Sequence, residues 1–202
     1  MFYDTRKNDH GLPHNPFKAI VAPRPIGWIT TMRLKGESNL APYSFFNGIT
    51  DKPPIVMFSS EGAKDSVAFA EETKEFVCSL TTYDLQIQMN GTSAPLPRGE
   101  SEMAATGLEA APSRLVKPPR VAASPCALEC KWLQTVRLND IEGKALDRYV
   151  VFGQAIGVYI NDTFIKNGRL DTAAMKPIAR LGYDEYAVID SVFKMTRPKG
   201  GG

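Results

Sequence analysis

Apolar and polar positions alternate with a period of two over residues 26–34, as expected for a β-strand that buries side chains on at least one face. The turn residues at 35–38 follow, and residues 39–46 can then run back antiparallel to the first strand. Proline has no backbone N–H group, so the two prolines at 53 and 54 interrupt the hydrogen bonding between strands. The next strand is therefore expected at 55–60. The first third of the chain therefore predicts a β-rich segment.

The rest of the chain continues this β-rich pattern, with helices only in the connections. Further strands are predicted at 75–81, 127–138, 149–160 and within 178–193, and short helices at 65–73, 84–90, 100–105 and 172–175. Residues 139–148 are expected to form the loop between the two long strands. We predict a mainly β fold, a β-barrel with helical decoration.

No repeat or linker divides the sequence, which predicts a single domain over residues 1–202. Residues 1–15 are expected to be an N-terminal arm, residues 15–25 an extended lead-in that packs against the barrel, and residues 198–202 a flexible tail.

The composition is that of a soluble globular protein, with 43% hydrophobic and 23% charged residues. A formal net charge of +2 favours neither nucleic acid nor an anionic membrane as a partner. No apolar run approaches the roughly 20 residues of a membrane-spanning helix, and the polar N-terminus does not resemble a secretory signal. We therefore expect a cytoplasmic protein that binds no nucleic acid and no membrane.

The cysteines and histidines do not form a recognisable catalytic or metal site. Cys126 and Cys130 fall in one predicted strand, where their Cα atoms would lie roughly 13 Å apart, too far for a disulfide. His10 and His14 are separated by Gly11 and Pro13, which break any helix that could bring them onto one metal. We assign no catalytic side chain and no metal site, and expect the chemistry to come from a cofactor.

One segment has the composition of a phosphate site. Lys64, Asp65 and Ser66 open the predicted helix at 65–73, and a helix N-terminus presents backbone N–H groups and a favourable dipole to an anion. The hydroxyls of Ser59 and Ser60 are close in sequence and add donors. The alternative is that Asp65 or Ser66 only caps the helix and that the hydroxyls only suit a strand surface.

Several motifs, taken together in their order, resemble the flavin reductase-like family. They are A-P-R-P-I-G-W-I-T-T at 22–31, N-L-A-P-Y-S-F-F-N at 39–47, P-P-I-V-M-F-S-S at 53–60, K-D-S at 64–66, E-F-V-C-S-L at 75–80, M-N-G-T-S at 89–93, S-R-L-V-K-P-P-R-V at 113–121, A-L-E-C at 127–130 and A-R-L-G-Y-D-E-Y-A at 179–187. This family comprises FMN-binding split-barrel proteins, including flavoredoxins and the reductase components of two-component monooxygenases. The resemblance covers about residues 16–188 and implies an FMN-binding split barrel.

The resemblance also implies a set of flavin contacts. The residues expected to line the flavin ring are Thr30, Thr31 and Met32, and those expected to wrap its edge are Pro42, Tyr43, Ser44, Phe45 and Phe46. The expected phosphate end comprises Ser59, Ser60, Lys64, Asp65 and Ser66. A flavin in the same or the partner subunit is expected to be contacted by Arg180, Leu181, Gly182 and Tyr183. Asn90 and Ser93 are expected to support the contacting residues without touching the flavin.

For three of these positions the residues alone leave a second interpretation open. Phe45 and Phe46 can equally be core residues. Arg180 can equally be a surface ion-pair residue.

The function implied by the resemblance is an NAD(P)H-dependent flavin reductase that transfers hydride from a nicotinamide to FMN and supplies reduced flavin to a monooxygenase or other acceptor. The alternatives are a flavoredoxin-type electron carrier with tightly held FMN and a split barrel that binds a ligand without redox chemistry. A homodimer with flavin near the interface is also implied. The sequence leaves open whether the donor is NADH or NADPH, because no discriminating residue of a dinucleotide fold is present.

Overall fold

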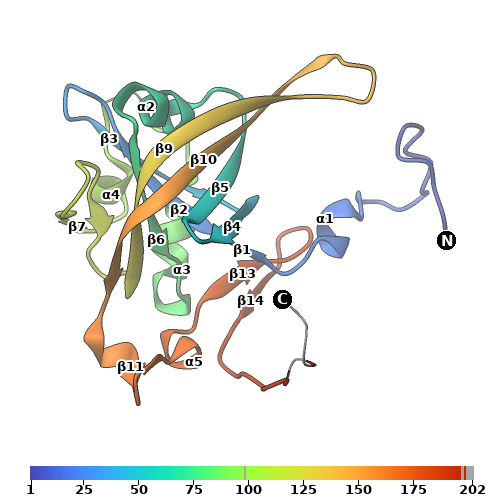
Figure 1. The fold of residues 1–202 in the computed structure, drawn as a ribbon. Helices are drawn as coiled ribbons and strands as arrows, with labels where there is room; N and C mark the ends of the chain where they lie inside the picture. Colours follow the sequence, from blue (N-terminus) through green and yellow to red (C-terminus); the bar gives the residue numbers. More distant parts are fainter. Residues whose placement is uncertain (98, 197, 199–202) are drawn as a thin grey trace.

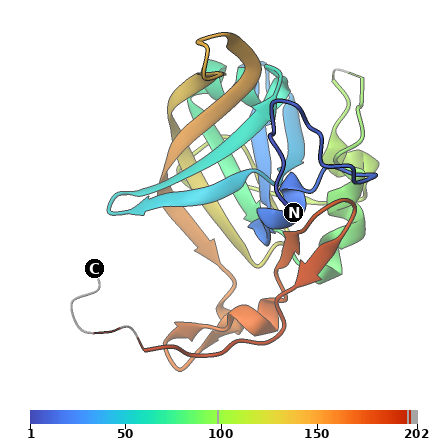
Figure 2. The same ribbon diagram turned by 90° about the vertical axis from the view of Figure 1, so that its right-hand side faces the viewer.

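A seven-stranded antiparallel sheet that curls into a barrel dominates the computed structural model, which describes residues 1–97, 99–196 and 198 (Figures 1 and 2). In their order across the sheet, the strands are β3 (Ser38–Tyr43), β2 (Gly27–Met32), β6 (Glu75–Leu80), β9 (Cys126–Asn139), β10 (Ala145–Ile160), β5 (Pro54–Glu61) and β4 (Phe46–Asp51). The mainly β fold predicted from the hydrophobic pattern is thus confirmed.

The barrel closes because β3 and β4 lie at opposite edges of the sheet but are neighbours in the chain. Only Ser44 and Phe45 separate them, so the two edges must meet. The backbone N–H of Ser59 on β5 donates to the carbonyl of Phe45 at 2.8 Å, and the Tyr43 ring lies 4.8 Å from the Phe58 ring. We call this junction of β3 with β4 and β5 the seam.

The interior of the barrel is filled by a cluster of apolar side chains that includes Ile29, Phe58 and Phe76, each fully buried. The helix α2 (Asp65–Thr73) adds Val67 to this core. A Cβ at Gly153 would lie 2.3 Å from the Phe76 ring, so glycine at this position lets the ring pack directly against β10.

A second apolar cluster covers the other face of β2 and β3. Trp28 and Leu40 pack there against Met89 of α3 (Gln86–Gly91) and Met103 of α4 (Glu102–Ala105), with α3 preceded by the 3₁₀ turn η1 (Tyr83–Leu85). Both faces of β2 are therefore buried, which explains why its residues are apolar or neutral on either side.

Smaller elements surround the barrel. They are the sheet of β1 (Arg24–Pro25), β13 (Ile178–Arg180) and β14 (Tyr186–Val188), the pair β7 (Ala110–Ala111) and β8 (Arg120–Val121), the pair β11 (Ile165–Lys166) and β12 (Arg169–Leu170), the 3₁₀ turn η2 (Asp162–Phe164) and the helices α1 (Phe17–Ile20) and α5 (Thr172–Met175). The hairpin of β9 and β10 extends well beyond the barrel (Figure 1).

Three local predictions were wrong. Residues 15–25 are not simply extended, because α1 forms at Phe17–Ile20. Residues 39–46 are not one strand, because the chain leaves β3 after Tyr43 and enters β4, a strand that pairs with β5 and had not been predicted. The loop expected at 139–148 is shorter, because β9 ends at Asn139 and β10 starts at Ala145.

Three further features concern the cysteines, the helix lengths and the C-terminal tail. Cys78, Cys126 and Cys130 are all free thiols. None of the helices in this part is long and apolar enough to cross a membrane. Residues 199–202 of the expected flexible tail lie outside the described residues.

Candidate functional site

A groove runs over the outside of the barrel from the start of α2, across β3, to β13 and β14. It consists of three adjoining hollows of about 520, 200 and 410 Å³. Pro42 and Ser93 line both the first and the second hollow, and Asn90 and Arg180 line both the second and the third. Residues from sequence segments far apart are therefore brought together along one surface feature.

The first hollow contains the predicted phosphate end. Lys64, Asp65 and Ser66 all line it. Helix α2 begins at Asp65 with Lys64 in the N-cap position, and the Lys64 side chain makes no capping hydrogen bond. The N-cap position is thus occupied by Lys64 and not by Asp65 or Ser66, which are the first two residues of the helix. The start of a nine-residue helix, with a lysine beside it, is a favourable place for an anion.

Ser66 is held in place from the neighbouring strand. The side-chain amide of Asn39 on β3 donates a hydrogen bond of 2.7 Å to Ser66 Oγ. Burial raises the pKa of the Tyr43 phenol, while hydrogen bonds with the side chains of Ser66 and Ser60 act in the opposite direction. The Tyr43 phenol thus lies between these two hydroxyls.

The two strand serines of the predicted phosphate end do not line the groove. Ser60 is buried and its hydroxyl donates to the carbonyl of Gly62 at 2.9 Å, behind Tyr43. Ser59 pairs with Val150 on β10 and uses its N–H to close the seam.

The predicted ring contacts on β2 do not line the groove either. Thr30 and Thr31 are fully buried, Met32 is half-buried, and none of the three lines a hollow. Among the described residues, the hydroxyls of both threonines lack a hydrogen-bond partner. Thr31 pairs directly with Asn39, which lines the first hollow. Buried hydroxyls without partners mark a place where water or a ligand can complete the hydrogen bonding.

Of the residues expected to wrap the edge of the flavin, some line the groove and one packs against the barrel core. Pro42, Tyr43 and Ser44 line the groove. Phe46 packs against the barrel core, and a Cβ at Gly27 would lie 2.5 Å from its ring. The core interpretation therefore fits Phe46. Phe45 is 39% exposed, and the Arg24 guanidinium lies 5.5 Å from its ring centroid.

Of the R-L-G-Y segment, residues 180–183, only Arg180 lines the groove. Arg180 lines the second and third hollows and hydrogen-bonds to the Tyr186 hydroxyl and the Tyr183 carbonyl. No carboxylate among the described residues forms an ion pair with it, so the surface ion-pair interpretation is not supported.

The other three residues of this segment hold the N-terminal part of the chain. The Leu181 carbonyl accepts a hydrogen bond of 2.7 Å from the buried Arg24 guanidinium. A Cβ at Gly182 would lie 2.5 Å from that of Ala19 on α1. The Tyr183 ring meets the His14 ring edge-on at 5.7 Å.

Sequence reasoning missed three residues that shape the first hollow. Asn39 positions Ser66, and Thr92 accepts a hydrogen bond of 2.9 Å from the Trp28 indole. Glu102 accepts a hydrogen bond of 3.0 Å from the N–H of Leu40 on edge strand β3. Asn39 and Thr92 belong to the motifs N-L-A-P-Y and M-N-G-T-S and could have been found there, whereas nothing in the sequence marks Glu102.

The groove is lined by hydrogen-bond donors, by aromatic rings and by the carboxylates of Asp65, Glu102 and Asp184. Neither histidine lines it, because His10 contacts Tyr3 and His14 contacts Tyr183. No group of three or more metal-ligating side chains occurs in the described part of the chain.

The comparisons with known proteins concern almost the whole chain. Residues 21–168 match the model of the flavin reductase like domain. A protein of Aquifex aeolicus of uncharacterised activity is 34% identical over 192 residues, which is 92% of this chain and 94% of the relative.

Two solved structures are similar in fold. Component B of nitrilotriacetate monooxygenase from Bacillus cereus superposes with a TM-score of 0.88 at 25% identity, covering 96% of this chain and 98% of that one. A protein with a split barrel domain from Shewanella frigidimarina NCIMB 400 superposes with a TM-score of 0.81 at 22% identity, covering 97% and 94%. The predicted split-barrel fold is thereby confirmed.

Proposed function

This chain belongs to the flavin reductase-like family, and on that premise we propose that it is an NAD(P)H-dependent FMN reductase that passes reduced flavin to an acceptor. Family membership supports a flavin cofactor and a flavin-related redox function. The choice of FMN, the nicotinamide donor and the release of reduced flavin are parts of the proposal.

The observation that carries the proposal is the continuity of the groove. One end holds Lys64, Ser66 and the start of α2, and the other end holds Arg180 and Tyr186. A ligand with a phosphate at one end and a flat polar ring at the other complements this arrangement. FMN is such a ligand.

The residues present fit this cofactor. Lys64 and the Ser66 hydroxyl supply donors to the phosphate, with the N-terminal dipole of α2 behind them. Pro42, Ser44 and Asn90 supply flat cover and neutral hydrogen-bonding groups further along. The hydroxyls of Thr30 and Thr31 have no hydrogen-bond partner among the described residues, and the two side chains point to opposite faces of β2. The volumes of the hollows are in the usual range for small-molecule sites, roughly 300–1,000 Å³.

Bound FMN would supply the two-electron chemistry, so the protein needs no catalytic nucleophile or metal of its own. The side chains then have to hold the ring and leave one face open to a donor. The third hollow continues from Asn90 and Arg180 and is lined by Tyr83, Ile87 and Tyr186. We assign this hollow to the nicotinamide donor, because it adjoins the proposed ring position and offers apolar and aromatic cover.

The acceptor proposed is a monooxygenase. This choice rests on the similarity to component B of a monooxygenase from Bacillus cereus. We also propose a homodimer. Four apolar side chains of the long β9–β10 hairpin are 37–89% exposed and available to a second copy: Leu133, Val136, Leu138 and Ile141. Light scattering on the purified protein tests the dimer, and a monomer at micromolar concentration would contradict it.

The test of the function is a visible spectrum of the protein titrated with FMN and then, without air, with NADH and NADPH. A reductase binds FMN and bleaches the flavin bands rapidly with at least one of the two nucleotides. Flavin that is bound tightly but stays oxidised would support the electron carrier instead. Absence of flavin binding would overturn the proposal and leave a split barrel for another ligand.

A further inference from the structure

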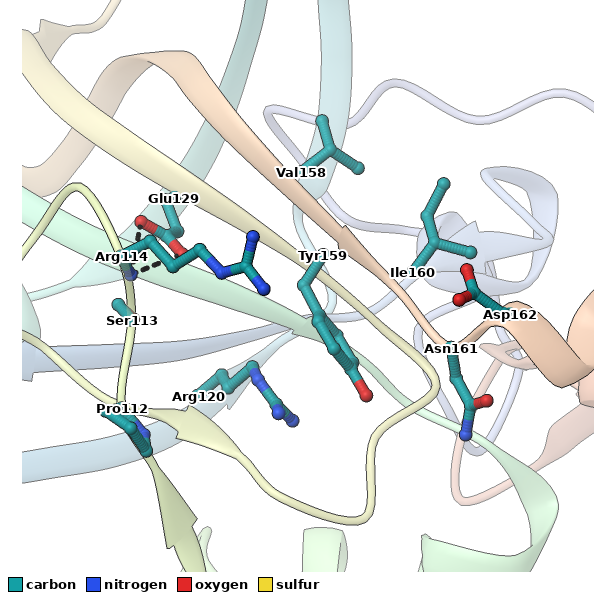
Figure 3. A pocket seen from close by; sticks show the side chains of 10 residues that line it. All are labelled: Pro112, Ser113, Arg114, Arg120, Glu129, Val158, Tyr159, Ile160, Asn161 and Asp162. Atoms are coloured by element: carbon teal, nitrogen blue, oxygen red, sulfur yellow. Dashed lines mark hydrogen bonds between the residues drawn. The ribbon is translucent and has the colours of Figure 1, made fainter.

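A separate hollow of about 770 Å³ lies between the β7–β8 loop and the ends of β9 and β10 (Figure 3). It shares none of its lining residues with the groove. Arg114 and Arg120 reach into it from the loop side, and Tyr159 and Asn161 from the end of β10 (Figure 3). We call it the arginine pocket.

A buried carboxylate fixes the loop that carries Arg114. Glu129 on β9 is 6% exposed, and its two oxygens accept hydrogen bonds from the backbone N–H groups of Arg114 (2.9 and 3.1 Å) and Leu115 (2.6 Å). The negative charge of Glu129 is therefore directed at the loop backbone. The Arg114 guanidinium extends from this fixed loop toward Tyr159 (Figure 3).

A second buried carboxylate holds the same loop two residues later. Glu75 on β6 accepts a hydrogen bond of 2.8 Å from the Lys117 N–H and forms an ion pair with Lys131. Burial raises the pKa of Glu75, but the hydrogen bonds from Lys131 and Lys117 outweigh it and hold that pKa below its ordinary value. Because both glutamates belong to paired strands, β6 and β9, the loop is preorganised before any ligand arrives.

Arg120 is fixed by a stacking contact. Its guanidinium carbon lies 3.6 Å from the centroid of the Tyr159 ring, and one of its nitrogens donates to the carbonyl of Ala122 at 3.1 Å. Stacking on an aromatic ring leaves the N–H groups at the edge of the guanidinium available for other acceptors.

The remaining polar groups of the pocket are mostly donors. Asn161 uses its amide oxygen to accept from the N–H and hydroxyl of Thr163, so its NH₂ group is the part left for a ligand. The Arg114 guanidinium, the Asn161 NH₂ group and the Tyr159 hydroxyl have no hydrogen-bond partner among the described residues. Asp162 is the one exposed carboxylate of the lining.

We propose that the arginine pocket is a second ligand site, distinct from the flavin groove, that binds a phosphate-bearing small molecule. A phosphate group offers several acceptor oxygens in different directions, which matches donors that converge from separate segments of the chain. The pocket's volume is in the range that accommodates a ligand of nucleotide size, roughly 300–1,000 Å³.

The experiment is calorimetric titration of the FMN-saturated protein with inorganic pyrophosphate, and separately with citrate. Saturation with FMN keeps pyrophosphate away from Lys64 and Ser66. We expect saturable binding of pyrophosphate, in the millimolar range or tighter. R114A should weaken it about tenfold, since one charge-assisted hydrogen bond is lost. R114A should fold normally, because Glu129 holds the backbone of Arg114 and not its side chain.

Two further variants sharpen the test. R120K keeps the positive charge but loses the planar guanidinium group with its several N–H donors. It should weaken pyrophosphate binding and leave the affinity for FMN unchanged. The matched control is R137A, an exposed arginine on the β9–β10 hairpin outside the pocket, which should bind pyrophosphate as the unmodified protein does.

Three results would overturn the proposal: no saturable binding of pyrophosphate, binding of citrate alone, or equal weakening by R114A and R137A. None of these results depends on nucleotide oxidation, so the proposal can fail while the reductase assignment stands.

Discussion

The indole Nε1 of Trp28 donates a hydrogen bond of 2.9 Å to Thr92 Oγ1, joining barrel strand β2 to the residue that follows α3. Trp28 is 0% and Thr92 2% exposed, so no solvent can replace this contact. Thr92 Oγ1 in turn donates to the carbonyl of Met89 at 2.8 Å. One buried hydroxyl therefore fixes both the end of α3 and the wall of the first hollow.

Replacing this hydroxyl should destabilise the fold. Thr92→Val keeps the shape but leaves the Trp28 N–H without an acceptor, and we expect the free energy of unfolding in urea to fall by about 1–3 kcal/mol. Thr92→Ser keeps the hydroxyl and loses one methyl group, so its loss should be at most about 1 kcal/mol. Equal losses in the two variants would show that packing, and not the hydrogen bond, is responsible.

The proposed phosphate end can be tested by binding. Lys64→Ala combined with Ser66→Ala should weaken FMN binding by about 2–4 kcal/mol, because two donors to the phosphate are lost. Flavin fluorescence quenching gives the dissociation constant, and Lys52→Ala, an exposed lysine on the β4–β5 turn, serves as the charge-matched control. An unchanged dissociation constant in the double variant would mean that the phosphate binds elsewhere.

The contact between Gly182 and α1 predicts a steric effect. Gly182→Ala places a methyl group 2.5 Å from the Ala19 Cβ, so α1 must move, and we expect a loss of about 1–3 kcal/mol in the free energy of unfolding. Adding Ala19→Gly should restore part of that loss. If the second substitution makes the loss larger, the close approach is not its cause.

Stability should fall in alkaline solution in part because of the buried Cys78 thiol. Burial raises the pKa of Cys78 from 9.0 to about 12. Above about pH 9 the thiol ionises in the unfolded chain but stays neutral in the folded one. Its contribution is therefore complete below about pH 9 and is lost as the pH rises toward 12.

Urea unfolding at several pH values in this window, with Cys78→Ala for comparison, isolates the effect. The stability advantage of the unmodified protein over Cys78→Ala should shrink as the pH rises. A constant difference between the two proteins would exclude this thiol as the source.

The sequence predicted most of the barrel because its strands alternate clearly and are bounded by Gly and Pro. The helix Asp65–Thr73 was predicted with its observed limits, since charged residues precede a compact apolar run. The break between β3 and β4 was not predicted. Tyr43, Ser44, Phe45 and Phe46 have no turn chemistry of their own, and the chain bends there only because the barrel has to close.

The site was predictable in outline and less so in detail. The motifs identified Lys64, Ser66 and Arg180, all of which line the groove. They did not reveal that Thr30 and Thr31 are fully buried, or that Gly182 packs against α1, because a motif does not show on which side of the backbone each contact falls. Glu102 was missed because its role depends on a long-range contact with Leu40.

The position of the β9–β10 hairpin in the sheet has a consequence for synthesis on the ribosome. The hairpin is inserted between β6 and β5, two strands that precede it in the chain by 45 residues or more. Until residues 126–160 have emerged, both earlier strands present an unpaired edge, the kind of surface that pairs with other chains. We expect nascent chains that stop before residue 126 to aggregate or to occupy chaperones, and full-length chains to become soluble once the hairpin has closed both edges.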